Sequence, residues 1–260
     1  MRYQRRTPFE MCGWRGASRT TLALTWSSEM AYVVGLTATD GCLVTGQRAI
    51  NFKSSDRELV ETYVRLLGRT NTVKSQRTRI GGVAFYTQFK DARLYEWFRT
   101  IGLSSRKSLT LGAIDVPDRF LLPLTRGLLD GDGTILNKTY RADTHGRPNY
   151  RWEYFQIRFV SASRPHIDWL RARLQALLQI DGYVATERAR AGRHPMSVLR
   201  YGKGASVILA RELYADPESP ALQRKRAIWD SYAARTRLAT DPSGEYNEGS
   251  DSSRPGGVTW

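Results

Sequence analysis

Two stretches, AYVVGLTATDG (residues 31–41) and LTRGLLDGDG (residues 124–133), share one pattern and decide how the rest of the chain is interpreted. Each is an apolar run that has small residues four positions apart and ends in Asp-Gly. In a helix, Gly35 and Thr39 lie on one face, as do Gly127 and Gly131, so two such helices can approach closely. Glycine inside a helix costs about 1 kcal/mol relative to alanine, which favours helix–helix contact as the reason for the pattern.

Each stretch ends in an aspartate, Asp40 or Asp132. We expect Gly41 and Gly133 to be left-handed helix caps, which places each aspartate at the last helical position. A carboxylate is unfavourable there because the helix C-terminus carries partial negative charge. Two such helices side by side bring the carboxylates together, an arrangement that a divalent cation stabilises. Oxygen ligands without histidine or thiolate favour Mg²⁺, and a phosphodiester is then the natural substrate.

The segments that follow the two motifs also correspond, which indicates an internal repeat. In the first repeat, the patterns predict strands near 48–53, 73–76 and 83–89, and helices over 56–67 and 92–100. In the second, they predict strands near 154–160, 183–187 and 197–201, and helices over 165–178 and 205–214. We interpret residues 141–151 as a long hairpin connection. The expected fold is α+β, with helix, hairpin, helix, hairpin, helix in each of two pseudo-symmetric units.

We divide the chain into a basic N-terminal arm (residues 1–26), a first repeat (27–122), a second repeat (123–234) and a tail (235–260). The tail is expected to be disordered, because its Gly, Ser and Pro cannot bury enough apolar surface to order it.

The charge balance indicates a polyanionic partner. The chain has 260 residues, with 40 Lys and Arg against 25 Asp and Glu, a net charge of +15 and a pI near 10.1. No apolar run approaches the roughly 20 residues of a membrane span, and the N-terminus lacks a secretion signal, so we expect neither export nor membrane insertion. The two cysteines fit a reducing compartment.

The two motifs, GLTATDG (residues 35–41) and GLLDGDG (127–133), resemble the signature helices of LAGLIDADG homing endonucleases in their single-chain form with two motifs. The resemblance covers roughly residues 29–232. It implies a monomer with two αββαββα repeats, whose saddle-shaped antiparallel sheets lie on double-stranded DNA with a long target site. It also implies cleavage of both strands across the minor groove with divalent metal, leaving 3′ overhangs.

The resemblance assigns roles to residues at matching positions. Asp40 and Asp132 match the catalytic, metal-binding acids, with Thr39 and Gly131 beside them in the metal site. Ala38 departs from the family pattern, whereas Asp130 retains it. The expected metal is Mg²⁺, with Mn²⁺ as a substitute and Ca²⁺ supporting binding without cleavage.

Further residues are assigned by their place in each repeat. Lys107 and Lys225 correspond to a basic residue near the scissile phosphates, and their alternative role is ordinary phosphate anchoring. Asp56 and Ser163 follow the first strands at equivalent places and are candidates for ordering water.

Strand alternation gives a set of polar residues that we expect to face the major groove. In the first repeat these are Arg48, Asn51, Lys53, Lys74, Gln76, Arg77, Arg79, Tyr86, Gln88 and Lys90. In the second they are Asn137, Lys138, Arg151, Gln156, Arg158, Arg188, Arg190 and Arg200. We expect a little over half of them to touch DNA.

The Asp-Gly-Asp-Gly cluster (residues 130–133) fits a calcium-binding loop or a surface turn less well than a metal-binding helix end. An EF-hand loop from Asp130 would need glycine at its sixth place and glutamate at its twelfth, where Ile135 and Arg141 stand. A surface turn explains either motif alone, but neither the apolar helix before it nor its recurrence. No GxxxxGK[ST] or GxGxxG loop occurs.

The sequence therefore predicts a site-specific DNA endonuclease of the intron-homing kind. Its expected location is the cytoplasm, with the nucleoid, of a prokaryote or phage-infected cell, or else an organelle. Two alternatives stay open: a DNA-binding regulator without hydrolysis, and an RNA maturase on the same fold. Neither the DNA target nor the intron or intein context can be deduced from strand composition.

Overall fold

The structure is a computed structural model that describes residues 23–78, 81–105, 107–144, 147–187 and 194–236, without the side chains of residues 142–151. The expected N-terminal arm and tail therefore fall mostly outside the described residues. None of the described helices is both long and apolar enough to cross a membrane.

The first repeat begins with a helix whose N-terminus is capped by Ser27, because the side chain of this residue accepts a hydrogen bond from the amide of Met30 at 3.1 Å. Its elements are α1 (Ser28–Asp40), β1 (Gly41–Val44), β2 (Ala49–Ser54), α2 (Arg57–Leu66), β3 (Lys74–Arg77), β4 (Val83–Lys90) and α3 (Ala92–Thr100).

The second repeat has the same order and ends with an additional helix. A short 3₁₀ turn, η1 (Asp118–Phe120), leads into it. Its elements are α4 (Leu121–Gly131), β5 (Thr134–Thr144), β6 (Arg147–Ser161), α5 (Arg164–Leu178), β7 (Gly182–Glu187), β8 (Met196–Tyr201), α6 (Lys203–Leu213) and α7 (Gln223–Thr236).

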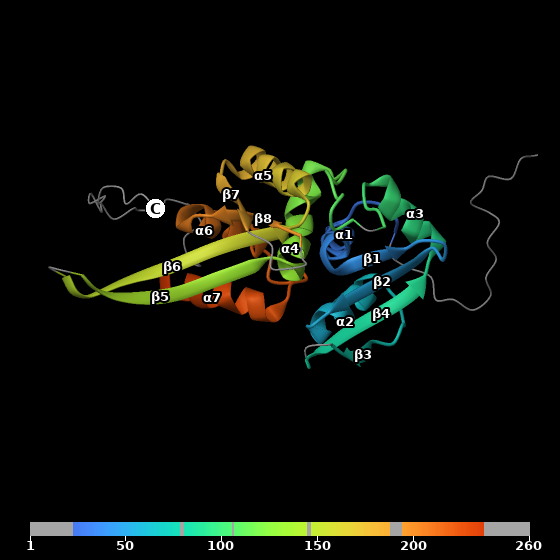
Figure 1. The fold of residues 1–260 in the computed structure, drawn as a ribbon, viewed down its shortest axis with the longest axis horizontal. Helices are drawn as coiled ribbons and strands as arrows, with labels where there is room; N and C mark the ends of the chain where they lie inside the picture. Colours follow the sequence, from blue (N-terminus) through green and yellow to red (C-terminus); the bar gives the residue numbers. More distant parts are fainter. Residues whose placement is uncertain (1–22, 79–80, 106, 145–146, 188–193, 237–260) are drawn as a thin grey trace, which may run out of the picture.

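Each repeat forms one four-stranded antiparallel sheet, and the two sheets have equivalent orders, β1-β2-β4-β3 and β5-β6-β8-β7. Helices α1 and α4 lie side by side in the middle of the molecule, with one sheet on either side of the pair (Figure 1). The predicted α+β fold of two αββαββα units is confirmed.

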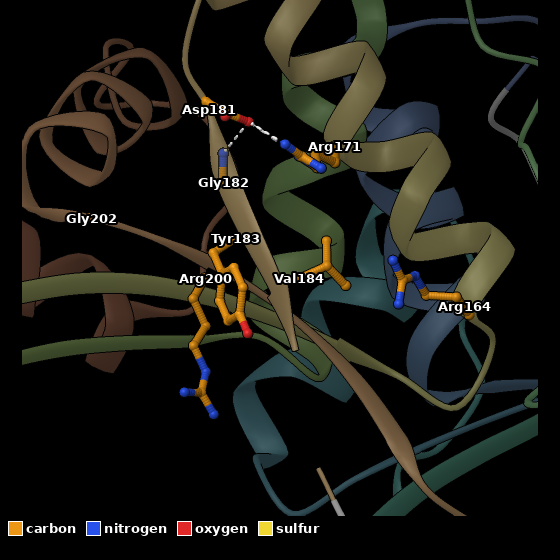
Figure 2. Close-up of a pocket in the computed structure, with 8 residues that line it drawn as sticks. All are labelled: Arg164, Arg171, Asp181, Gly182, Tyr183, Val184, Arg200 and Gly202. Atoms are coloured by element: carbon orange, nitrogen blue, oxygen red, sulfur yellow. Dashed lines mark hydrogen bonds and ion pairs between the residues drawn. The ribbon is translucent and has the colours of Figure 1, made fainter. Parts of the chain in front are cut away.

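Alternation along the strands gives each sheet a helix-covered face and an open face. Phe52 and Phe89 place the first sheet's covered face in the core, and Phe155 and Leu199 do so in the second sheet. In the second repeat, α5 is also tied to the sheet edge. Arg171 of α5 pairs with Asp181, just before β7, at 2.7 Å, beside a surface pocket of about 480 Å³ (Figure 2).

The predicted long connection over residues 141–151 is mostly strand. Arg141 pairs with Arg151 and Ala142 with Tyr150, so only residues 145–146, outside the described residues, separate β5 from β6. Residues on either side of this stretch, Thr139 and Tyr140 before it and Trp152 and Tyr154 after it, favour strands, and the two strands continue into it despite the turn signals of Gly146 and Pro148. The result is a long two-stranded ribbon that projects from the second sheet (Figure 1).

Candidate active site

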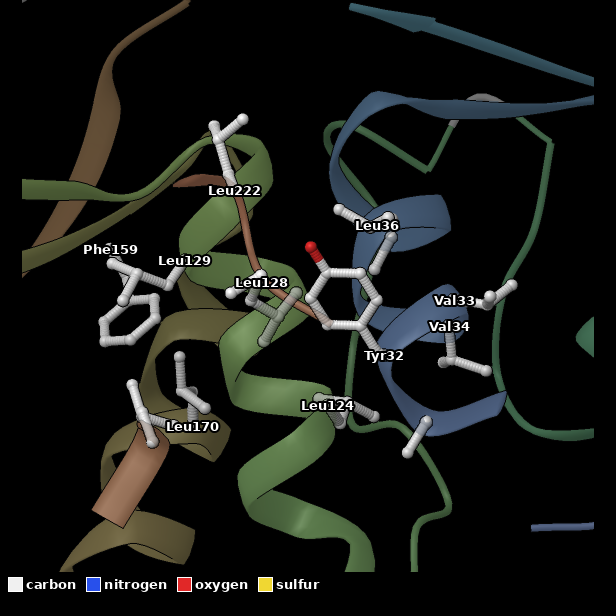
Figure 3. Packing of buried hydrophobic residues seen from close by; sticks show 14 of the residues in the cluster. Tyr32, Val33, Val34, Leu36, Leu124, Leu128, Leu129, Phe159, Leu170 and Leu222 are labelled. Carbon is white, nitrogen blue, oxygen red and sulfur yellow. The ribbon is translucent and has the colours of Figure 1, made fainter. Parts of the chain in front are cut away.

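The close approach of α1 and α4 depends on their glycines. A Cβ atom at Gly35 would collide with the carbonyl oxygen of Leu124 and lie 2.8 Å from the amide nitrogen of Leu128. At Gly127 it would collide with the carbonyl oxygen of Tyr32. Figure 3 shows side chains of the two helices, Tyr32 among them, filling the space around this contact. The small-residue stripes of the sequence therefore form a backbone-to-backbone contact.

This contact brings one acid from each repeat to the same end of the helix pair. Asp40 is the last residue of α1, and Asp132 caps the C-terminus of α4. Thr39 lies against Gly131, because a Cβ atom at Gly131 would collide with the Thr39 hydroxyl. The four residues that the sequence assigns to a metal site are thus gathered at the helix ends.

The glycines after the acids are not left-handed, contrary to the sequence expectation. Gly41 has φ −86° and ψ 156°, and Gly133 is not among the positive-φ glycines. Lack of space for a side chain explains why glycine stands at both positions. A Cβ at Gly41 would lie 2.7 Å from the Cα of Thr37, and one at Gly133 would lie 2.7 Å from the Cα of Leu129. Glycine lets each strand begin directly against the last helical turn.

The two acids are affected by the same two lysines. Burial and the charge of Asp132 raise the pKa of Asp40 to about 7, while Lys225 and Lys107 lower it. Partial desolvation also raises the pKa of Asp132, although that residue keeps contact with solvent, and the same two lysines lower it. Two carboxylates held at helix C-termini therefore repel each other in the apo protein.

The two lysines predicted to act near the acids are buried against the helix ends. Lys107 donates a hydrogen bond to the carbonyl oxygen of Gly41. Lys225 donates to the carbonyl oxygens of Leu129 at 2.5 Å, Asp130 at 2.9 Å and Gly133 at 2.7 Å. Burial lowers the pKa of Lys225 to about 8 and also lowers that of Lys107. Each lysine places a cation where the helix end is negative.

The candidates for ordering water have protein partners. Asp56 receives two hydrogen bonds from Arg224, at 2.9 and 2.8 Å, which tie the start of α2 to α7 next to Lys225. Ser163 is buried and donates to the carbonyl oxygen of Leu111 at 2.5 Å. Thr39, Asp132 and other residues line a cavity of about 30 Å³, enough for one water molecule.

The open face of the first sheet carries most of the polar residues predicted to contact DNA there. Strand pairing places seven of them on that face: Asn51, Lys53, Lys74, Gln76, Tyr86, Gln88 and Lys90. Arg77 is opposite Val83 and falls on the other face. Arg48 lies in the β1–β2 turn and forms an ion pair with Glu96 of α3 at 3.4 Å. Arg79 is outside the described residues.

The open face of the second sheet carries four of its predicted residues: Lys138, Gln156, Arg158 and Arg200. Arg200 also forms an ion pair with Glu187 on the same face, at 2.7 Å. Asn137 lies on the helix-covered face, where its amide donates to Glu153 at 2.8 Å and its oxygen accepts from Arg235 of α7 at 2.9 Å. This placement removes Asn137 from the proposed DNA contacts. Arg188, Arg190 and the side chain of Arg151 lie outside the described residues.

Known proteins share sequence and structural features with this chain. Residues 27–100 match the family model described as a LAGLIDADG-like domain. Residues 27–100, which hold most of the first repeat, are therefore similar to a LAGLIDADG-like domain. None of the curated protein sequences compared with the chain matches it.

Solved structures extend the likeness to both repeats. The homing endonuclease I-WcaI bound to its DNA recognition sequence is 10% identical, with a TM-score of 0.52 over 77% of this chain and 88% of that one. I-DmoI in complex with DNA and Ca is 12% identical, with a TM-score of 0.50 over 77% of this chain and 96% of that one. At these identities the likeness establishes the fold.

The ends of α1 and α4 suit a hard divalent cation. No group of three or more His, Cys, Asp or Glu side chains that could hold a metal occurs in the part of the chain that the structure describes. Mg²⁺ in nucleic-acid enzymes, however, uses one or two carboxylates and completes its shell with water and substrate phosphate. Asp40 and Asp132 supply such a pair, and a cation would offset both the burial and the mutual repulsion that raise the pKa of Asp40. The residues therefore fit Mg²⁺.

The structure adds polar residues behind the site that the sequence analysis gave no role. Asp130 is buried, and its Oδ2 accepts hydrogen bonds from the hydroxyl of Tyr32 at 2.7 Å and the amide of Leu222 at 2.8 Å. Arg126 donates to the carbonyl oxygen of Leu213 at 2.6 Å. These bonds connect α4 to α1, to the end of α6 and to the segment before α7. The sequence could not predict these bonds, because their partners are far apart along the chain. The only sign of them is that Arg126 and Asp130 are charged residues in an otherwise apolar helix.

Proposed function

We propose that this chain is a monomeric, site-specific double-strand DNA endonuclease of the homing type. It hydrolyses one phosphodiester in each strand across the minor groove, leaves 3′ overhangs and requires Mg²⁺. Mn²⁺ substitutes for Mg²⁺, and Ca²⁺ supports binding without cleavage. We place it with the nucleoid of a prokaryotic or phage-infected cell, or in an organelle.

One observation carries the proposal: Asp40 and Asp132 come from separate repeats and lie at the same end of the paired helices, where Thr39 packs against Gly131. A structural role does not explain this, because a carboxylate at a helix C-terminus is unfavourable and the second one adds repulsion. The buried lysines do not form direct bonds to the acids; they bind main-chain carbonyl oxygens instead. The acids therefore remain available for a cation.

Different residues of the chain would bind the DNA, hold the metal and position the acids. The open faces of the two sheets hold the duplex through Lys53, Lys74, Lys138 and Arg158. Asp40 and Asp132 would hold Mg²⁺, which when bound supplies charge stabilisation at the attacked phosphate and activates water. Lys107 and Lys225 keep the two helix ends rigid and add positive charge beside the scissile phosphates. The contact between α1 and α4 fixes the separation of the acids.

The test compares Asp40→Asn and Asp132→Asn with the wild-type protein on a site selected from a random duplex library by binding in Ca²⁺. Each variant should retain binding within a few-fold and lose double-strand cleavage in Mg²⁺. Asp168→Asn is the matched control, because Asp168 is an exposed residue of α5 that pairs with Arg164 at 2.8 Å. It should cleave normally.

Normal cleavage by both Asp40→Asn and Asp132→Asn would contradict the proposal. A wild-type protein that binds its selected site and leaves it intact with Mg²⁺ and with Mn²⁺ would instead indicate a DNA-binding regulator.

A further inference from the structure

Three aromatic side chains form a cluster on the open face of the β5–β6 ribbon. The rings of Tyr140 and Trp152 stack with their centroids 4.6 Å apart and their planes at 18°. Tyr154 meets both rings edge-on, at 6.4 and 6.0 Å. Tyr140 is 42% exposed and Trp152 is 41% exposed. An aromatic pair of this size that stays open to solvent is the type of surface that binds a partner.

The ribbon is braced from behind, so the cluster has a fixed direction. Arg235, near the end of α7, donates to Asn137 at 2.9 Å and to Glu153 at 2.5 Å, both on the covered face. Asn137 also bonds Glu153 across the two strands. Because strand side chains alternate, bracing this face presents Tyr140, Trp152 and Tyr154 on the other.

Neighbouring side chains indicate which partner the cluster suits. Lys138 lies two residues before Tyr140 on the same face of β5, opposite Tyr154. Gln156 and Arg158 continue that face along β6 towards the helix ends. The cluster is thus the outer end of a basic, polar surface, which suits a polyanion that also has apolar groups: a DNA duplex, with its deoxyriboses and thymine methyl groups.

We propose that Tyr140, Trp152 and Tyr154 pack against the outer part of the DNA target and supply binding energy that does not depend on salt. This proposal rests on the proposed function, because it assumes that the open faces hold DNA. Tyr140 lies eight residues after Asp132. At about 3.3 Å per strand residue this is about 26 Å, or about eight base pairs at ~3.4 Å each, from the acids. The cluster should therefore contact DNA about eight base pairs from the cleavage site, and only in the half of the target that the second repeat binds.

The experiment measures binding to the Ca²⁺-selected duplex by fluorescence anisotropy over a series of KCl concentrations. Trp152→Ala and Tyr140→Ala should each weaken binding about tenfold, with the slope of log affinity against log salt unchanged. Lys138→Ala should reduce that slope. Thr139→Ala, on the opposite face of the same strand, is the matched control and should bind as the wild type does.

A second arm trims the duplex at the end next to the second repeat, removing the pairs beyond about the sixth from its centre. The wild type should lose about tenfold in affinity, and Trp152→Ala should lose almost nothing more. Trp152→Phe should restore binding to the full duplex, which separates contact loss from misfolding.

Unchanged binding by Trp152→Ala, or an equal loss on full and trimmed duplexes, would overturn the proposal. So would sedimentation of the free wild type as a dimer that Trp152→Ala dissociates, because the cluster would then be a contact between copies. Failure of the wild type to cleave the same duplex with Mg²⁺ would contradict the proposed nuclease function and leave these binding results interpretable.

Discussion

At the residue scale, the acids and lysines at the helix ends form one electrostatic unit. Asp40 and Asp132 stand where the helix termini are already negative, and each helix end has its own buried lysine. Lys225 binds three carbonyl oxygens at 2.9 Å or less, so it caps α4 in addition to placing charge near the acids. Its removal should therefore affect both stability and cleavage.

Replacing Lys225 by methionine should lower the free energy of unfolding by about 2–3 kcal/mol, because buried carbonyl oxygens lose their donor. Cleavage should fall as well. Urea denaturation checks the first effect. Lys203→Met changes an exposed lysine at the start of α6 and should be nearly neutral. Equal stability of the two variants would show that Lys225 does not cap α4.

His166 should make the stability of the protein depend on pH. It is buried, contacts the carbonyl oxygen of Gly112 through Nδ1 at 2.9 Å, and has a pKa lowered by burial. As the pH falls, His166 is therefore protonated in the unfolded chain at a higher pH than in the folded protein. Stability is full above about pH 6.5 and falls as the pH drops below it. Thermal unfolding between pH 7 and 5 should show a steeper loss for wild type than for His166→Asn. Parallel curves would contradict this sign.

At the element scale, the glycine pattern of α1 and α4 decides how the halves join. The i,i+4 stripe is visible in the sequence because close helix contact is the main reason to keep glycine in a helix. The conformations of Gly41 and Gly133, in contrast, cannot be predicted from the sequence. An Asp-Gly pair at a helix end fits a left-handed cap and also a strand that starts tightly against the helix, and only the packing on Thr37 and Leu129 distinguishes the two.

Gly127→Ala should destabilise the protein by about 3 kcal/mol, at the upper end of overpacking costs, because the new methyl group meets backbone atoms of α1 that cannot move independently. Gly204→Ala is the control. It adds a methyl group in α6 with nothing within 4 Å and should leave stability equal or slightly higher. Similar denaturation midpoints for the two variants would mean that the helices can separate at little cost.

At the scale of the whole molecule, a strongly basic chain presents two open sheet faces on either side of the paired helices (Figure 1). The sequence identifies most of the polar strand residues, but not the face of each. One step of register moves a side chain to the opposite face, which is why Asn137 and Arg77 lie away from the open faces. The cluster at Tyr140 follows the same alternation, but the turn signals of Gly146 and Pro148 conceal the strands that carry it.

DNA binding should depend steeply on salt. Lys53 and Lys74 lie on the open face of the first sheet, and each phosphate contact contributes about 0.9 to the slope of log affinity against log salt. The double variant Lys53→Ala and Lys74→Ala should therefore reduce the slope by about 2. Arg57→Ala, which removes an exposed arginine of α2 paired with Glu61, should leave it unchanged. Equal slopes for all three proteins would place the DNA elsewhere.

The most direct test of the account is anomalous diffraction from crystals of the protein with its selected duplex and Mn²⁺. We predict an anomalous peak in contact with the carboxylates of both Asp40 and Asp132 and with a DNA phosphate. A complex whose manganese lies away from these residues, or whose two carboxylates each face a separate side of the molecule, would contradict the shared metal site on which the proposed nuclease depends.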